Sequence, residues 1–156
     1  RPKRRNIPFM ATMCFCSRAA HRGEEQGRQD DLESWVYMIL ELFSTKNLAW
    51  APLEKEKGKM KTDELLKAVL AEKEKYFQGE HAKDELVPSD FNRASEYIGR
   101  LEYTHDPDYA FIRQCLLDSA LRNNIDLHAA PKEWVGKDLT KPKPKRKKER
   151  SVCSSQ

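Results

Sequence analysis

The sequence has few glycines and no long run of apolar residues. Its six glycines are scattered and nowhere spell G-x-G-x-x-G, the pattern in which backbone N–H groups cradle a nucleotide phosphate. No apolar stretch reaches the roughly eighteen residues of a membrane-spanning helix, and the basic residues 1–5 are not followed by the apolar run of a secretory signal. We therefore expect no membrane contact and a cytoplasmic or nuclear location, or both.

The sequence also lacks paired cysteine motifs. Cys14, Cys16, Cys115 and Cys153 are irregularly spaced, which favours reduced thiols over a disulfide framework. Cys14 and Cys16 could join His21 as metal ligands, but no fourth ligand is evident, so we expect no metal site.

Composition predicts one modest domain with a basic tail. Charged residues make up 35% of the chain and hydrophobic ones 38%. We divide the chain into a basic, mobile N-terminal stub (1–8), a domain (9–130) and a disordered basic tail (131–156). Residues 141–150 contain no apolar side chain, and burial therefore cannot offset the entropy of ordering them.

The basic run 141–150 has three interpretations. It could bind a nuclear import receptor, contact nucleic acid or another acidic surface, or simply be a solvated extended tail. Nucleic-acid binding is the least favoured, because no aromatic residues are interleaved to stack on bases.

A central helix is expected at 31–43. Asp30 is placed as its N-cap, with Glu33 completing a start that resembles a capping box. Its apolar side chains are too numerous for one stripe, which predicts a helix buried on all sides within a larger protein. These side chains are Leu32, Trp35, Val36, Met38, Ile39, Leu40, Leu42 and Phe43.

Three further helices come after it, and no strand pattern of useful length is present. A loop is expected at 46–53, and the charge run 54–61 is a solvated linker or frayed helix. The next helix is capped by Thr62, another opens at Pro88–Ser89, and the last has Asp106 as N-cap with Pro107 in its first turn. Their expected core faces hold Leu65, Leu66, Val69, Leu70 and Tyr76; Phe91, Ala94, Ile98 and Leu101; and Tyr109, Ile112 and Leu116.

Several motifs occur together in a fixed order. Residues 9–21 read F-M-A-T-M-C-F-C-S-R-A-A-H, and residues 27–34 read G-R-Q-D-D-L-E-S. Later come N-L-A-W (47–50), K-E-K-Y (73–76), P-S-D-F (88–91) and P-D-Y-A-F-I-R-Q (107–114). Over residues 9 to about 125 the chain resembles casein kinase I and the tau-tubulin kinases, whose pattern is close to F-x-G-T-x-R-Y-A-S-x-N-A-H followed by G-R-x-D-D-L-E-S.

This resemblance implies a mainly α fold, the helical C-terminal lobe of a serine/threonine protein kinase, incomplete and without an N-lobe. The Gly-rich loop, the H-R-D-type catalytic Asp and the D-F-G metal ligand are not in the sequence, and the residues at 21–23 are H-R-G. We therefore expect a fragment that starts in the activation segment, with no catalytic residue and no cofactor of its own. The intact parent would use Mg-ATP and protein substrates.

The resemblance also implies roles for five residues. Thr12, Cys14 and Ser17 fall in the substrate-binding segment, where the family's threonine supports the catalytic Asp. Cys14 replaces an arginine that anchors anionic substrates, a loss of about 1.5–3 kcal/mol of charge-assisted hydrogen bonding. Asp31 matches a structural Asp that fixes the catalytic loop, although N-capping alone would also explain it. Arg113 matches a structural Arg that pairs with a Glu, for which Glu24 and Glu25 are the candidates here.

Two functions remain open. The chain is part of an ATP-dependent serine/threonine kinase, or it belongs to a pseudokinase or helical interaction scaffold. Ala11, in place of the family's glycine, and Cys14 favour the second somewhat. A catalytic Asp and a D-F-G Asp elsewhere in the parent would favour the first.

Overall fold

The computed structural model describes residues 3–44, 46, 48–80 and 87–127. These residues form helices, and apart from an isolated bridge between Lys57 and Met60 they contain no strand. The prediction of a mainly α fold, as in a kinase C-lobe, is confirmed. Among the helices that the structure describes, none combines the length and apolar character that a membrane crossing requires.

The chain divides into one compact unit from Arg1 to Ile125 and another from Asp126 to Gln156. All the helices within the described residues belong to the first unit. The predicted tail at 131–156, with its basic run at 141–150, lies outside the described residues.

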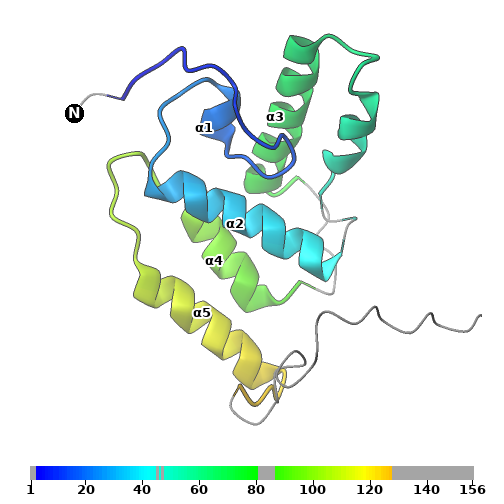
Figure 1. Cartoon of the computed structure of the whole chain (residues 1–156). Coiled ribbons are helices and arrows are strands. Elements are labelled where there is room, and N and C mark those ends of the chain that lie inside the picture. Colours follow the sequence, from blue (N-terminus) through cyan, green and yellow to red (C-terminus); the bar gives the residue numbers. More distant parts are fainter. Residues whose placement is uncertain (1–2, 45, 47, 81–86, 128–156) are drawn as a thin grey trace, which may run out of the picture. The chain divides into compact units, whose positions relative to one another are not determined.

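Each helix packs against one or two of the others (Figure 1). Helix α1 packs on α3, α2 on α4, and α4 on α5, while the short 3-10 helix η2 lies against α3. Their shared core contains buried residues from α2 through α5, with Leu48 and Trp50 from the α2–η2 connection. The bounds are α1 Arg18–His21, α2 Arg28–Phe43, η2 Ala51–Glu56, α3 Thr62–Gln78, α4 Ser89–Gly99 and α5 Tyr109–Arg122.

Helix α2 begins earlier than predicted. Gly27 is its N-cap, and Asp30 is the third helical residue, whose carboxylate accepts the Gly27 backbone N–H at 2.7 Å. The prediction of Asp30 as N-cap is therefore wrong. The sequence is ambiguous here, because an acid can accept a free backbone N–H either from the N-cap position or from the first turn. Glu33 does not cap the helix and bonds to α1 instead.

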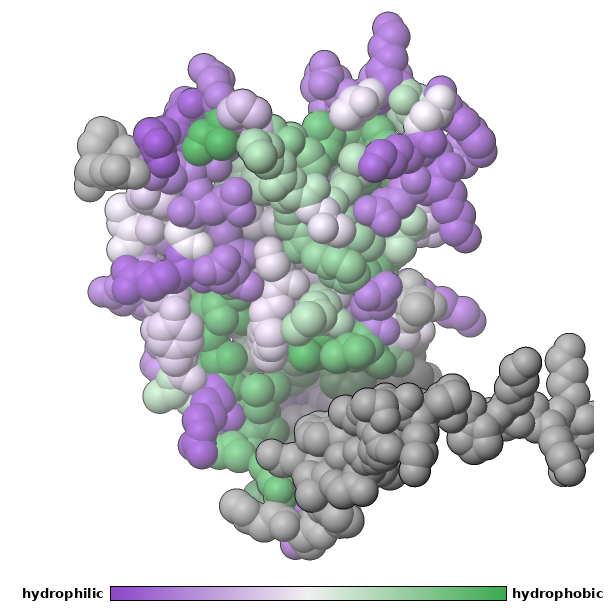
Figure 2. All heavy atoms as spheres, viewed as in Figure 1, coloured by the Kyte–Doolittle hydropathy of each residue, from purple (hydrophilic) through white to green (hydrophobic). Residues whose placement is uncertain are grey.

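Helix α2 is also not enclosed on every side. Val36, Tyr37 and Leu40 are buried, whereas Met38 is 47% exposed and Leu42 is 76% exposed. The prediction of burial all round is wrong for the flank that carries Met38 and Leu42, which is open to solvent among the described residues. Figure 2 shows hydrophobic residues running over the middle of the molecular face in view.

The later helices match their predictions to different degrees. Helix α3 starts at Thr62 but has Lys61 as N-cap, and α4 starts at Ser89 as expected. Helix α5 is capped by Asp108, whose carboxylate accepts the Phe111 N–H at 2.8 Å, so the assignment of Asp106 as N-cap is wrong.

The predicted core face of α5 is partly wrong. Ile112 is buried as expected, but Tyr109 is 54% exposed and Leu116 is 39% exposed. Cys115 lies in the core instead, because the buried stripe of α5 runs through Ile112 and Cys115.

The N-terminal residues are held against the loop after α1. The Arg4 carbonyl accepts the Glu25 N–H at 2.9 Å, and Ile7 donates its N–H to the Gly23 carbonyl at 2.9 Å. Gly23 has a φ of 64°, and a Cβ there would come within 3.0 Å of the Ile7 carbonyl oxygen, so glycine suits both the turn and the close approach. Residues 4 and 7 of the predicted stub therefore have backbone partners in the structure, while the mobility of residues 1–8 remains a prediction.

Candidate functional site

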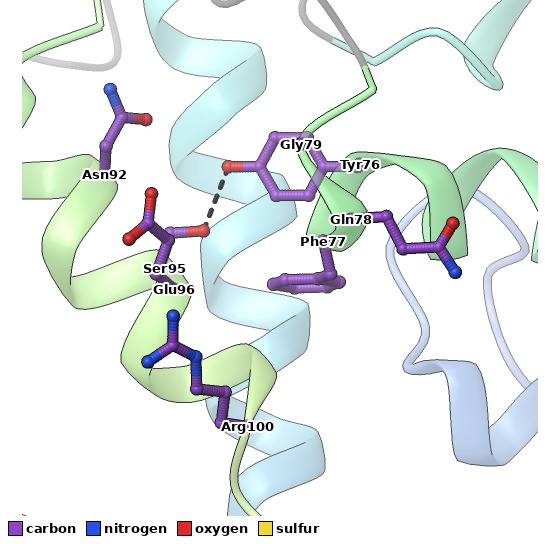
Figure 3. A pocket seen from close by; sticks show the side chains of 8 residues that line it. All are labelled: Tyr76, Phe77, Gln78, Gly79, Asn92, Ser95, Glu96 and Arg100. Atoms are coloured by element: carbon purple, nitrogen blue, oxygen red, sulfur yellow. Dashed lines mark hydrogen bonds between the residues drawn. The ribbon is translucent and has the colours of Figure 1, made fainter.

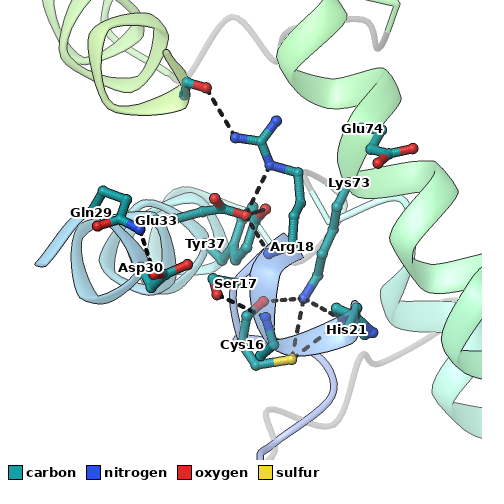
Figure 4. A network of polar contacts seen from close by, with 12 residues as sticks. Cys16, Ser17, Arg18, His21, Gln29, Asp30, Glu33, Tyr37, Lys73 and Glu74 are labelled. Atoms are coloured by element: carbon teal, nitrogen blue, oxygen red, sulfur yellow. Dashed lines mark hydrogen bonds and ion pairs between the residues drawn. The ribbon is translucent and has the colours of Figure 1, made fainter. Parts of the chain in front are cut away.

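The main polar feature of the core is a buried lysine that forms no ion pair with any carboxylate among the described residues. Lys73 of α3 is fully buried, and its Nζ donates to the carbonyl oxygens of Met13 at 2.9 Å and Cys16 at 2.6 Å. The same Nζ lies 3.1 Å from Nε2 of His21 (Figure 4). These partners use all three N–H bonds of the ammonium group. The lysine therefore holds the segment before and within α1 on α3.

Aromatic rings complete the lysine's surroundings. Nζ lies 4.7 Å from the ring centroid of Tyr37 and 5.6 Å from that of Trp50, distances at which the ring faces attract a cation. Burial lowers the pKa of Lys73 to about 8, an effect that the nearby Cys16 and Glu33 partly oppose. At neutral pH the side chain is therefore mostly charged.

His21 is neutral in this cluster. Burial, and then the positive charge of Lys73, lowers the pKa of His21 to about 4. Nε2 accepts a hydrogen bond from Lys73 and lies 3.3 Å from the Cys16 sulfur, which places the ring proton on Nδ1. Nδ1 is buried and has no hydrogen-bond partner among the described residues.

Trp50 binds the same segment from another side. Its Nε1 donates to the carbonyl oxygen of Cys14 at 2.8 Å, and its ring meets that of Tyr37 edge to face with centroids 4.9 Å apart. Together, Lys73 and Trp50 bind the carbonyls of Met13, Cys14 and Cys16. The backbone of this segment is fixed by side chains from outside it.

A second polar network connects the start of α1 to three other helices. Oε1 of Glu33 accepts the Arg18 N–H at 2.7 Å, the Arg18 Nε at 3.1 Å and the Tyr37 hydroxyl at 2.6 Å. The Arg18 guanidinium also donates to the Gly99 carbonyl at 3.0 Å and lies 4.1 Å from the Phe77 ring centroid. Burial, and then the charge of Glu33, raises the pKa of Tyr37, so its hydroxyl stays a donor.

The three predicted substrate-binding residues lie in this segment but differ in exposure. Thr12 is exposed and borders surface pockets of about 300 Å³ and about 240 Å³. Cys14 is only 4% exposed, and burial raises the pKa of its thiol to about 11. Ser17 is fully buried and caps α1 by accepting the Ala20 N–H at 3.2 Å. Substrate binding by these residues remains a prediction, and only Thr12 is open to solvent here.

The two predicted structural residues are both exposed. Asp31 has no hydrogen bond or ion pair within the described part of the chain, whereas its neighbour Asp30 is buried. Burial raises the pKa of Asp30, while the Gly27 amide and the Ser17 hydroxyl lower it. In the same described part Arg113 forms no ion pair.

Both carboxylates proposed for Arg113 have other partners. Glu24 pairs with Lys3 at 2.6 Å, and Glu25 pairs with Arg4 at 3.0 Å. The structure therefore does not show the suggested ion pair between Arg113 and Glu24 or Glu25.

Sequence reasoning missed the residues that hold the site together. Lys73 comes after Leu65 and Val69 at four-residue intervals, so it occupies the buried stripe of α3. A lysine within this apolar stripe is the feature of the sequence that could have predicted a buried cation. The residues described contain no group of three or more His, Cys, Asp or Glu side chains placed to hold a metal ion.

Replacing Lys73 by methionine tests the lysine's role. We expect the free energy of unfolding to fall by about 2–4 kcal/mol, since the stem is kept while buried carbonyls lose their donor. Chemical denaturation followed by circular dichroism measures the change.

Lys75→Met is the matched control, because Lys75 is exposed and pairs with Glu72 on the same helix. It should change stability by less than about 0.5 kcal/mol. A Lys73→Met protein as stable as the parent would show that the carbonyl bonds do not outweigh the cost of burying the charge.

Comparison with known proteins identifies related chains. No family model matches. The serine/threonine-protein kinase spe-6 of Caenorhabditis elegans is 28% identical over 144 residues, which cover 91% of this chain and 36% of that kinase. The putative serine/threonine-protein kinase ZK507.3 of the same nematode is 35% identical over 107 residues, covering 68% of this chain and 25% of the relative. Casein kinase I homolog 2 of Schizosaccharomyces pombe is 31% identical over 127 residues, which cover 80% of this chain and 27% of that relative.

The chain thus spans between 25% and 36% of the length of these relatives. Their names agree with the resemblance found in the ordered motifs, and the helical fold agrees with the predicted lobe. The chain is therefore similar to serine/threonine protein kinases, among them a casein kinase I homolog.

Proposed function

We propose that this chain forms part of the C-terminal lobe of a casein-kinase-I-like serine/threonine protein kinase and helps to position protein substrates. The intact parent would bind Mg-ATP and transfer the γ-phosphoryl group to a serine or threonine hydroxyl. Support comes from kinase relatives that match along most of this chain and from the order of its motifs. The parent would act in the cytoplasm or nucleus, with the run at 141–150 available to an import receptor.

The observation that carries this proposal is the fixed backbone of the segment around Cys14. Lys73 and Trp50 bind three of its carbonyls, and Thr12 stays exposed beside surface pockets. Catalysis of phosphoryl transfer depends largely on positioning and charge stabilisation. A rigid segment that presents an exposed hydroxyl can supply positioning without supplying chemistry.

Phosphate binding and proton transfer would come from residues that this sequence does not contain. It has no Gly-rich phosphate loop, no H-R-D-type Asp and no D-F-G Asp. The buried cation Lys73 cannot replace them, because its N–H groups already serve the protein itself. We therefore propose that this chain alone binds no Mg-ATP.

A thermal-shift experiment tests this part of the proposal. We expect no change in the melting temperature of the chain on addition of Mg-ATP. Binding at a hundredfold excess over Kd would add about 2.7 kcal/mol to the stability of the folded state, an easily measured effect. An active kinase domain with Mg-ATP serves as the positive control. A clear shift for this chain would contradict our placement of the nucleotide site outside it.

A second candidate is a pseudokinase or helical scaffold that binds partner proteins. The exposed apolar side chains Met38, Leu42 and Leu121 and the buried Cys14 at the family's arginine position favour it. Phosphate transfer by the full parent to a generic protein substrate would exclude this candidate. A parent that lacks the catalytic and D-F-G aspartates would support it.

A further inference from the structure

A thiol and an amine lie close together in the interior of the domain. The Cys16 sulfur is 3.9 Å from Nζ of Lys73 and 3.3 Å from Nε2 of His21. Cys16 is 6% exposed, and Cys16 and Lys73 are 57 positions apart in sequence. Figure 4 shows their side chains converging from the segment just before α1 and from α3. The proposed kinase function does not use this pair.

We propose that Cys16 and Lys73 form an oxidation site, at which the Lys73 amine captures peroxide-oxidised Cys16 as a covalent sulfur–nitrogen bond. The link would join the segment before α1 to α3. This modification stands independently of the proposed function, because it requires only the two side chains and a peroxide.

The reaction balances in two steps. The Cys16 thiol attacks hydrogen peroxide, so that a sulfur–oxygen bond forms, the oxygen–oxygen bond breaks, and one water leaves with a sulfenic acid remaining. The neutral Lys73 amine then attacks that sulfur, the sulfur–oxygen bond breaks, and a second water leaves. Sulfur is oxidised by two electrons, and the peroxide is reduced to two waters. An added dithiol reverses the link by returning two electrons and two protons.

The surroundings support each step. Cys16 borders a surface pocket of about 240 Å³, together with Thr12 and Phe15, which gives a small neutral oxidant a route. Burial raises the pKa of the Cys16 thiol, whereas the charge of Lys73 lowers it, so we expect slow oxidation. His21 is neutral and its Nε2 is within reach of both groups as a proton acceptor.

The amine is suited to capture the oxidised sulfur. Its pKa of about 8 leaves part of the Lys73 population neutral in mildly alkaline solution, although the nearby Cys16, Glu33, Cys14 and Glu54 favour the charged form. The flexible lysine stem allows Nζ to close the remaining distance by releasing one carbonyl. The described cysteines are all free thiols, so no existing disulfide competes for Cys16.

The test is peroxide treatment of the full chain at mildly alkaline pH, followed by intact-mass measurement and peptide mapping. We expect a mass lower by two hydrogens, a linked peptide pair joining Cys16 to Lys73, and recovery of the original mass with dithiothreitol. The linked protein should also melt at a higher temperature, since the link constrains the unfolded chain.

Variants separate this site from other oxidation. Cys16→Ser and Lys73→Arg should abolish the linked peptide, while Cys14→Ser should retain it. Should Lys73→Arg fail to fold, the peptide map of the unmodified sequence decides alone. A Cys14–Cys16 disulfide has the same mass loss, but its peptides differ, and finding it would overturn the proposal. Sulfinic acid at Cys16, a link to another lysine, or unreacted Cys16 would overturn it as well.

Discussion

Replacing Trp50 by alanine is expected to lower the free energy of unfolding by about 4–6 kcal/mol, which is a large part of the roughly 5–15 kcal/mol that stabilises a typical domain. Trp50 is the largest fully buried side chain in the described core and contacts the rings of Tyr37 and Tyr76. Its removal leaves a large cavity and frees the Cys14 carbonyl. Urea denaturation followed by circular dichroism measures the loss.

Trp50→Phe divides this effect into its two causes. Phenylalanine keeps most of the ring packing but cannot donate to Cys14, so we expect a smaller loss of about 1–3 kcal/mol. Equal losses for alanine and phenylalanine would assign the whole effect to the hydrogen bond. No loss for alanine would contradict the placement of Trp50 in the core.

Replacing Glu33 by alanine should cost about 3–5 kcal/mol, because it leaves a charged and a neutral donor without their acceptor inside the protein. The Arg18 side chain and the buried Tyr37 hydroxyl both bond to the same carboxylate oxygen. Denaturant unfolding at neutral pH gives the change. Glu33→Gln keeps an acceptor oxygen, so its loss in the free energy of unfolding should be smaller than that of Glu33→Ala.

Asp31→Ala is the matched control on the same helix. Asp31 is exposed near the N-terminus of α2, so its removal should cost no more than about 1 kcal/mol of favourable interaction with the helix dipole. A larger loss for Asp31→Ala than for Glu33→Ala would reverse our assignment of which acid supports this region.

The helices were predictable where local signals were unambiguous. Pro88 has no backbone N–H to donate inside a helix, so it marks the point at which α4 can begin. The spacing of Phe91, Ala94 and Ile98 then defines the buried face of this helix. The start of α2 was misplaced because an aspartate serves equally well at the cap or in the first turn. The exposed flank of α2 could not be foreseen, since apolar composition does not say which neighbours cover a helix.

The candidate site was predictable as a segment but not as a network. The motif around Thr12 and Cys14 was visible in the sequence, and so was a lysine within the apolar stripe of α3. The contact between Lys73 and the Met13 carbonyl joins residues 60 positions apart. No local pattern encodes such a contact, because a backbone carbonyl carries no side-chain signature.

Arg18 has a consequence for the order in which the domain assembles. Its guanidinium bonds to the carbonyl of Gly99, a residue 81 positions later, at the C-terminal end of α4. Contacts between residues so far apart in sequence slow folding, so we expect this bond to form together with the packing of α2 on α4 rather than before it. We therefore expect damage to the end of α4 to loosen the start of α1 and, through it, the segment that presents Thr12.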